Sequence, residues 1–277
     1  MAAIIVILII TNFLVSWQGF RDRSFYERFR FDVEKVLLHK QFYRILTAGF
    51  LHVSWSHLIW NMIALYAFSS SITYFSGPLQ FLLIYFTSII GGNLFALFVH
   101  RHHGDYTSVG ASGGVNGIIF AAIALLPGMS IGFFFLPLSI PAWIFGLVYV
   151  VYSIYGMRGG RDGIGHEAHL AGALIGMTIA VGFHPEALNQ NLAIIMLIAI
   201  PMIVFIVFTL RRPHSLLIHN SSRSNAGYTT MEDRYNAEKL KKQKELDRIL
   251  EKISRRGIKS LNEKEKSLLK EFSKTVK

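Results

Sequence analysis

The chain has 277 residues, of which 52% are hydrophobic and only 16% are charged, and its mean hydropathy is +0.41. This composition excludes an ordinary soluble protein and predicts a polytopic membrane protein, because several apolar runs approach the roughly 20 residues of a membrane-crossing helix. No cysteine is present, which excludes disulfides and thiolate metal sites. The net charge of +11 is interpreted as a sign of membrane topology, so no nucleic-acid partner is expected. No cofactor is expected.

Seven apolar stretches predict transmembrane helices. They cover residues 2–20, 57–74, 79–99, 112–127, 142–155, 166–183 and 191–210. The first is not expected to be a cleavable signal, because no basic segment precedes it and no A-x-A site follows it. The loop 21–49 interleaves basic and aromatic residues, which favours the membrane interface. The proline-containing stretch 131–140 is expected to be a short interfacial connection.

Beyond residue 210 the composition becomes basic and polar, which divides the chain into a membrane domain, 1–210, and a tail, 211–277. The tail is expected to hold a linker (214–230), a helix (232–253) with apolar residues at helical spacing, and a second helix. Asn262 and Glu265 form the capping box that starts this second helix. The narrow apolar stripe favours a solvated pair of helices, and the alternative is a docking surface for an unknown partner.

The stretch Gly110-Ala111-Ser112-Gly113 stands between a polar loop and the apolar run of the fourth span. Backbone N–H groups at a helix start, with the positive end of the helix dipole, suit a developing oxyanion. The glycines let a substrate carbonyl approach the backbone closely. Small residues also mark tightly packed transmembrane helices, so the stretch alone is a weak sign of catalysis.

Polar residues inside apolar spans are costly, and three groups of them predict one site. These groups are His57 with Asn61 in the second span, Ser112 in the fourth, and His166 with His169 in the sixth. The three spans run in the same direction, so their N-terminal ends lie at one membrane face. Gly172 and Gly176 allow the sixth span to approach the glycine-rich fourth span closely, which would bring His169 to Ser112.

Other interpretations of these residues stay open. His57 and Asn61 are suited to hydrogen bonds between helices, and equally to an oxyanion hole completed by the backbone N–H of Ser112. A zinc site is a further alternative, although the H-E-x-x-H pattern is absent and no metal is expected. Its ligands would come from His52, His57, His166 and His169.

Three motifs stand in order along the chain: His52-x4-His57-x3-Asn61, Gly110-Ala111-Ser112-Gly113, and Ala168-His169-Leu170-Ala171-Gly172-x3-Gly176. In these motifs the chain resembles the rhomboid intramembrane serine proteases over about residues 1–210. The resemblance implies an all-α bundle with a six-helix core, to which this chain adds a seventh span. The tail is similar to helical extensions on rhomboids of the Bacteroidetes group, and the expected location is a bacterial inner membrane.

The resemblance also implies the roles of the site residues. Ser112 would be the nucleophile and His169 the general base of a dyad without an aspartate. His57, Asn61 and the backbone N–H of Ser112 would form the oxyanion hole. The expected partners are membrane lipid and membrane proteins whose transmembrane segments are cleaved. The alternative functions are a non-catalytic relative that binds membrane clients and a transporter. Inactive relatives lose the serine or the histidine, and both residues are present here.

Two departures from the family pattern stand out. The aromatic-Arg pair of the half-submerged first loop is Tyr43-Arg44 here, where Trp-Arg is usual. Asn116 stands four residues after the serine, where the family usually has an aromatic residue stacked on the catalytic imidazole. The carbonyl of Asn116 is expected to orient that ring by hydrogen bonding instead.

The distribution of lysine and arginine and the family resemblance predict opposite orientations of the chain in the membrane. With seven spans, every lysine and arginine lies on the side of the chain that also holds Ser112. The positive-inside rule therefore places Ser112 toward the cytoplasm. The family more often has its serine near the outer face.

Overall fold

The computed structural model describes residues 2–133, 136–159, 165–211 and 231–256, with residues 260–262, 265–266 and 268–269. It divides into two compact units, Met1–Asn225 and Ala226–Lys277. The expected boundary after residue 210 stays a prediction, because residues 212–230, which include the predicted linker, lie outside the described residues. Residues 160–164 of the glycine-rich loop before the sixth span also lie outside them.

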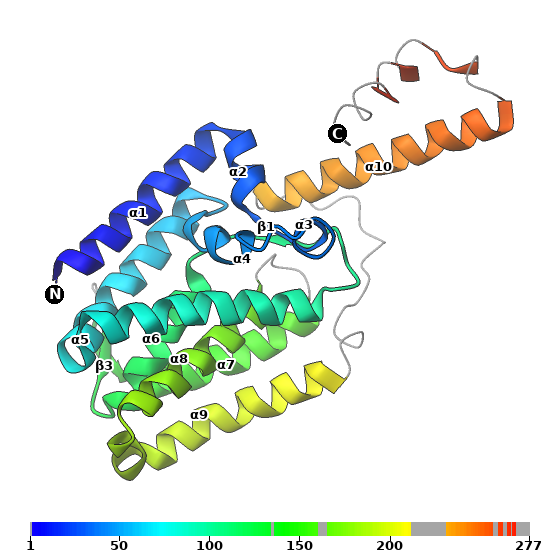
Figure 1. Cartoon of the computed structure of the whole chain (residues 1–277). Coiled ribbons are helices and arrows are strands. Elements are labelled where there is room, and N and C mark those ends of the chain that lie inside the picture. Colours follow the sequence, from blue (N-terminus) through cyan, green and yellow to red (C-terminus); the bar gives the residue numbers. More distant parts are fainter. Residues whose placement is uncertain are drawn as a thin grey trace. The chain divides into compact units, whose positions relative to one another are not determined.

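The first unit is a bundle of helices (Figure 1). Its long helices are α1 (Ala2–Arg21), α5 (Trp55–Val99), α6 (Ser112–Leu125), α7 (Ala142–Gly159), α8 (His166–Phe183) and α9 (Glu186–Arg211). By length and composition α1, α5 and α9 are able to cross a membrane, and α6 and α7 supply shorter apolar helices. The expected all-α membrane fold is confirmed, while the count of seven crossings stays a prediction.

Helix α5 contains both the second and the third predicted span. Its 45 residues would reach roughly 68 Å as one straight helix, more than twice the thickness of the hydrocarbon core. The helix breaks at Gly77, whose φ of 77° is rare for residues with a side chain, and Pro78 follows. The chain turns sharply there (Figure 1), as the Gly-Pro pair predicts.

The loop between α1 and α5 is made of short elements. They are α2 (Arg23–Phe29), β1 (Phe31–Asp32), α3 (Val33–Leu37), α4 (Arg44–Thr47) and the 3₁₀ helix η1 (Ala48–Phe50). The Asn93 amide of α5 donates to the carbonyl of Ile45 at 2.7 Å, which fastens α4 to the bundle.

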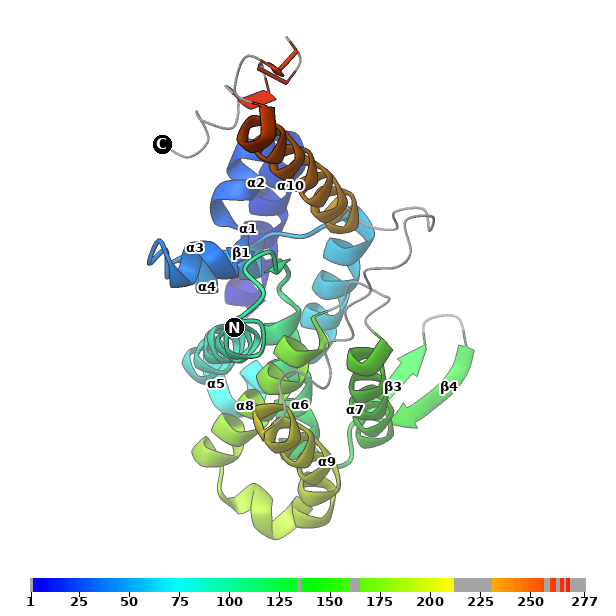
Figure 2. The same cartoon turned by 90° about the vertical axis from the view of Figure 1, so that its right-hand side faces the viewer.

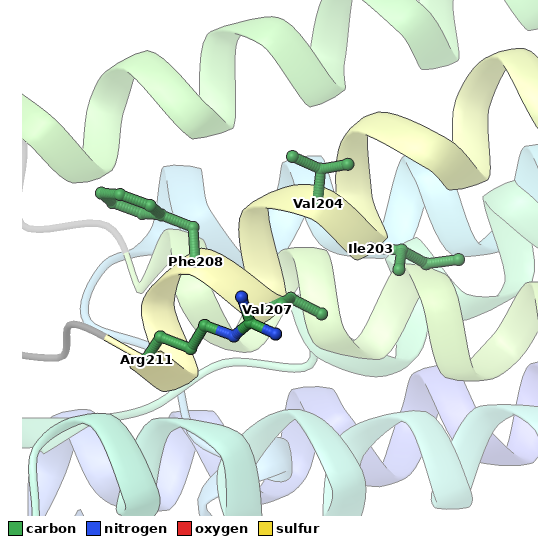
Figure 3. A pocket seen from close by; sticks show the side chains of 5 residues that line it. All are labelled: Ile203, Val204, Val207, Phe208 and Arg211. Atoms are coloured by element: carbon green, nitrogen blue, oxygen red, sulfur yellow. The ribbon is translucent and has the colours of Figure 1, made fainter.

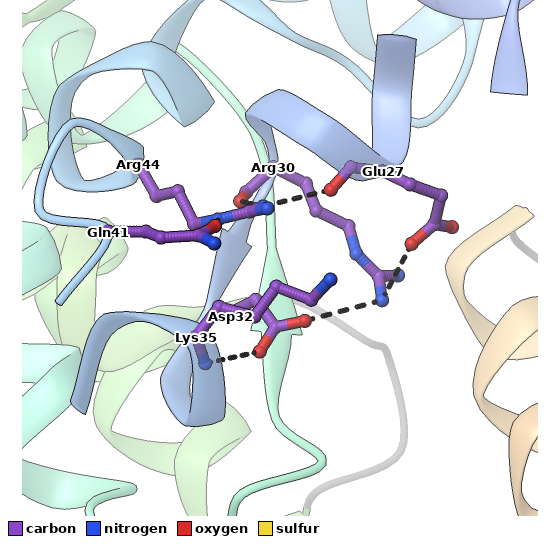
Figure 4. A network of polar contacts seen from close by, with 6 residues as sticks. All are labelled: Glu27, Arg30, Asp32, Lys35, Gln41 and Arg44. Carbon is purple, nitrogen blue, oxygen red and sulfur yellow. Dashed lines mark hydrogen bonds and ion pairs between the residues drawn. The ribbon is translucent and has the colours of Figure 1, made fainter. Parts of the chain in front are cut away.

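A polar network holds this loop together (Figure 4). The guanidinium of Arg30 is almost fully buried and pairs with Glu27 at 3.0 Å and Asp32 at 3.6 Å. Arg44 is also buried, and its Nη1 donates to the carbonyls of Glu27 and Arg30, both at 2.8 Å. Tyr43 is exposed beside it. The buried Arg44 and the exposed Tyr43 therefore link the interior of the loop to its surface.

The loop also pairs with the segment that leads to Ser112. Strand β1 pairs antiparallel with β2 (Thr107–Ser108), with Asp32 opposite Thr107. Beyond β2, the N–H of Gly110 donates to the carbonyl of Ala48 at 3.0 Å. The Arg30 network thus supports β1, and β1 supports the strand that precedes the serine.

Helix α6 is the centre of the bundle, because every residue from Gly113 to Leu125 is buried. It packs against α5 and α8, which also pack against each other, over surfaces of small residues. A Cβ on Gly172 of α8 would lie 2.5 Å from the carbonyl oxygen of Gly113, and a Cβ on Gly92 of α5 would lie 2.5 Å from that of Ala168. Glycine therefore allows these backbones to touch.

Between α6 and α7 the chain forms a β-hairpin of β3 (Ser130–Phe133) and β4 (Leu136–Pro141). It lies beside α7 (Figure 2). The expected interfacial connection over residues 131–140 is thus a pair of strands, because strand pairing satisfies backbone groups that a proline-containing stretch could not satisfy as a helix.

The second unit contains α10 (Met231–Arg256). The capping box predicted after it is present: the Asn262 side chain accepts from the Glu265 N–H, and the Glu265 carboxylate accepts from the Asn262 N–H, both at 2.8 Å. Lys252 of α10 pairs with Glu265 at 2.8 Å. The full extent of the second tail helix lies outside the described residues, and a docking role for the tail stays a prediction.

Candidate active site

Ser112 is the first residue of α6, and its hydroxyl meets His169 near the start of α8. The Ser112 Oγ and His169 Nε2 atoms are 2.5 Å apart. Gly110, two residues earlier, has a φ of 143°, and a Cβ there would lie 2.9 Å from the His57 ring. Only glycine suits this position, because the backbone and the space both exclude a side chain.

The closeness of α6 and α8 produces this pair. Gly172 lies three residues after His169, against the backbone of Gly113, and Gly176 lies against Gly117. The structure therefore brings together the serine, the histidine and both glycines of the sixth-span motif. Gly113 itself has ordinary space for a Cβ. The backbone of Gly113, and not the space beside its Cα, is what matters here, because Gly172 packs directly against it.

His57 lies beside the serine loop, as the second-span motif predicts. A Cβ on Gly110 would lie 3.2 Å from His57 Nε2 and 3.3 Å from Ser112 Oγ, so both side-chain atoms lie where a side chain of residue 110 would be. Asn61 lies one turn further, and its Nδ2 donates to the His57 carbonyl at 2.9 Å. A carboxamide has two N–H groups, so one remains for another acceptor. The oxyanion role of both residues stays a prediction.

His52 supports the backbone before the serine. Its Nδ1 is 2.8 Å from Ser16 Oγ of α1, and its Nε2 is 3.5 Å from the Ala111 N–H. Ser16 in turn donates to the carbonyl of Phe50 at 2.9 Å. Burial lowers the pKa of His52 to about 3, with a smaller effect of His57 in the same direction. A neutral His52 accepts the Ala111 N–H and donates to Ser16.

The other nitrogen of His169 meets a residue that the sequence motifs do not contain. Tyr149 of α7 has its hydroxyl 3.0 Å from His169 Nδ1. The Asn116 Nδ2 donates to the same hydroxyl at 2.8 Å. The expectation that the Asn116 carbonyl bonds the ring directly is therefore corrected, because its amide reaches the phenol and the phenol reaches the ring. The sequence did not single out Tyr149, because Tyr152, Ser153 and Tyr155 carry hydroxyls in the same predicted span.

A second unpredicted cluster lies where α8 begins. Glu167 is buried, and its Oε1 is 2.5 Å from the Tyr106 hydroxyl and 3.1 Å from His100 Nε2. The rings of His100 and Tyr106 stack with centroids 3.6 Å apart. Since Tyr106 stands directly before β2, this cluster holds the loop before Ser112 against α8.

His166 is buried beside the dyad without joining the short contact of Ser112 and His169. Its ring lies edge-on to His169, with centroids 6.2 Å apart, and edge-on to Tyr152 at 5.3 Å. Over the described residues, no three histidine, aspartate or glutamate side chains gather as metal ligands.

A shallow apolar groove also appears on α9, far along the chain from the dyad (Figure 3). It is lined by Ile203, Val204, Val207, Phe208 and Arg211. All five belong to one helix, and none is a predicted site residue. The groove therefore has no part in the site around Ser112.

Comparison with known families gives two matches. The Rhomboid domain model matches residues 39–186, and a family of unknown function, DUF6576, matches residues 229–275. The first match covers Ser112, His169 and all three motifs. The second covers most of the tail and assigns it no activity.

Curated relatives agree with the first match. RHOMBOID-like protein 12, mitochondrial, of Arabidopsis thaliana is 28% identical over 186 residues, which cover 61% of this chain and 54% of the relative. Rhomboid protein 1, mitochondrial, of Saccharomyces cerevisiae is 30% identical over 155 residues, 53% and 45% of the two chains. The human Presenilin-associated rhomboid-like protein, mitochondrial, is 31% identical over 135 residues, 48% and 36%.

The chain spans about half the length of the first of these relatives, and less of the others. The names describe mitochondrial proteins, and another relative from Arabidopsis is chloroplastic. They agree with an integral membrane protein and give no support to the expected bacterial inner membrane.

Proposed function

Because the chain belongs to the rhomboid family, we propose that it is an intramembrane serine endopeptidase that cleaves transmembrane segments of other membrane proteins. The observation that carries the proposal is the 2.5 Å contact of Ser112 Oγ with His169 Nε2 at the start of α6. A serine hydroxyl becomes a useful nucleophile when an adjacent base accepts its proton.

The reaction would proceed in two stages. His169 Nε2 takes the proton of Ser112 while Oγ bonds to the substrate carbonyl carbon, and the proton then passes to the leaving amine as the C–N bond breaks. Water attacks the resulting ester, again with His169 as base. The products are the amine released in the first stage and a carboxylic acid, and the proton taken from water restores the serine hydroxyl.

The developing oxyanion would be held at the start of α6. Ala111 precedes Ser112 as N-cap residue and offers no side-chain cap, so the first N–H groups of the helix are not capped by its side chain. These N–H groups and the helix dipole favour a negative charge. His57, whose Nε2 lies beside Gly110 together with Ser112 Oγ, is the side-chain donor best placed to assist.

The substrate class follows from the position of the dyad at the end of an apolar bundle. A helix hides its own carbonyls in hydrogen bonds, so a substrate segment has to unwind before Ser112 can attack it. Segments with glycine, proline or other weak helix formers near the bond should therefore be preferred.

A fluorophosphonate probe tests the proposal on the purified full-length chain. The wild type should be labelled, and Ser112→Ala and His169→Ala should not. Ser130→Ala, which alters an exposed serine of β3, is the matched control and should label like the wild type.

Absence of labelling in folded wild type would refute the proposal. It would favour the rival function, a non-catalytic protein that binds membrane clients.

A further inference from the structure

We propose that Tyr149, held by Asn116, is a positioning residue that sets the tautomer and ring orientation of His169. The inference rests on the proposed function and names a residue that the three sequence motifs do not contain. It gives the dyad a third partner, with a neutral phenol in the place where a serine-protease triad has a carboxylate.

Three helices supply the chain of contacts. Asn116 of α6 donates from Nδ2 to the Tyr149 hydroxyl of α7 at 2.8 Å, and that hydroxyl lies 3.0 Å from His169 Nδ1 of α8. The opposite ring nitrogen meets Ser112 at 2.5 Å. The imidazole is therefore bridged at both nitrogens, between the nucleophile and the phenol.

The chemistry requires one tautomer. A neutral imidazole has a single N–H, and His169 accepts the serine proton at Nε2 only when that N–H is on Nδ1. The Tyr149 oxygen is the acceptor found 3.0 Å from Nδ1. A phenol oxygen accepts hydrogen bonds as well as donating one, so it can receive the N–H groups of both Asn116 and His169.

Aromatic packing alone does not require a hydroxyl at this position. The Tyr149 ring lies among Phe120, at a centroid distance of 6.0 Å, and Phe145, at 6.2 Å. Phenylalanine would fill the same space, whereas a hydroxyl inside a membrane bundle is costly unless it is bonded. Hydrogen bonds of the Tyr149 hydroxyl go to Asn116, four residues after the serine, and to the base itself.

Tyr149→Phe removes only the hydroxyl and should slow fluorophosphonate labelling of Ser112 about three- to tenfold, which corresponds to one neutral hydrogen bond. Tyr155→Phe, on an exposed tyrosine of the same helix, is the control and should label at the wild-type rate. Asn116→Ala keeps the Tyr149 hydroxyl but removes the amide that holds it. Its labelling rate should therefore lie between those of Tyr149→Phe and the wild type.

The ¹⁵N NMR spectrum of histidine-labelled protein in detergent supplies a readout that a merely structural role would not change. Resonances missing from His169→Gln identify this ring. In the wild type the proton should be on Nδ1, and in Tyr149→Phe the two tautomers should mix.

Protonation of wild-type His169 at Nε2 would overturn the inference, and this result needs no variant of Tyr149. Equal labelling rates with an unchanged tautomer in Tyr149→Phe would overturn it too. The proposed function fails separately, when folded wild type is not labelled or when Ser112→Ala is labelled as well.

Discussion

Gly172 of α8 lies so close to Gly113 of α6 that a Cβ on Gly172 would be 2.5 Å from the Gly113 carbonyl oxygen. This contact sets the spacing of the two helices that carry Ser112 and His169. It also makes Gly172 a sensitive point, because a backbone atom cannot move aside as the end of a flexible side chain can.

Gly172→Ala should therefore force α6 and α8 apart and lower the free energy of unfolding by about 1–3 kcal/mol, the usual cost of overpacking. Labelling of Ser112 should fall with it. Gly182→Ala is the control on the same helix, where no atom lies within 4 Å of the added Cβ. Thermal unfolding in detergent measures both, and equal unfolding temperatures in the two variants would contradict the argument.

Ser112→Ala and His169→Ala should each abolish cleavage of a model transmembrane substrate, because the two residues act as one unit. The double variant should lose no more than either single variant. Turnover rates of the three proteins check this. Additive losses, or appreciable turnover in either single variant, would show that the two side chains act independently.

His57→Ala and Asn61→Ala should each reduce kcat by roughly 10²–10³-fold if each side chain supplies one oxyanion donor. The free N–H of Asn61 and the position of His57 beside Gly110 motivate the expectation. Steady-state kinetics with a model substrate give the measurement. Near-wild-type rates in both variants would indicate an oxyanion hole made of backbone groups alone.

The free energy of unfolding should fall as the pH is lowered from about 6.5 toward 3, because burial lowers the pKa of His52 to about 3 from its ordinary 6.5. Between these pH values His52 is protonated in the unfolded chain and neutral in the folded chain, so lowering the pH favours unfolding. The loss at pH 5 should be on the order of 1–2 kcal/mol.

Denaturant unfolding at pH 7 and pH 5 measures the effect of His52. His52→Gln should lose less stability between the two pH values than the wild type does. His39→Gln, at an exposed position, should behave as the wild type. The same pH dependence in all three proteins would remove His52 as its source.

Cysteine labelling should decide the orientation of the site in the membrane, in a background that has no native cysteine. Ser24→Cys and Asp105→Cys lie in exposed parts of the basic loops, and Gly128→Cys lies after α6. If the positive-inside rule holds, the first two should resist an impermeant maleimide in intact cells, and Gly128→Cys should react. The opposite pattern would place Ser112 on the outer side.

The predicted helices follow from local properties of the chain. The apolar runs, the Gly77-Pro78 break and the Asn262–Glu265 capping box depend on residues near one another in sequence, so patterns alone could predict them. The pairing of Ser112 with His169 could also be predicted from the sequence. Gly172 follows His169 by less than one turn and marks the face of that helix that can approach another helix closely.

Only the tertiary structure decided which distant residues complete the site. Tyr149, Glu167 and Ser16 carry no local signal that assigns them to His169, Tyr106 or His52. Their hydrogen bonds depend on how the helices are rotated about their axes and how deep they lie, which the hydrophobic pattern does not determine in a bundle that is apolar on nearly all sides. The same holds for β1, because two-residue strands acquire partners only when the fold brings Asp32 opposite Thr107.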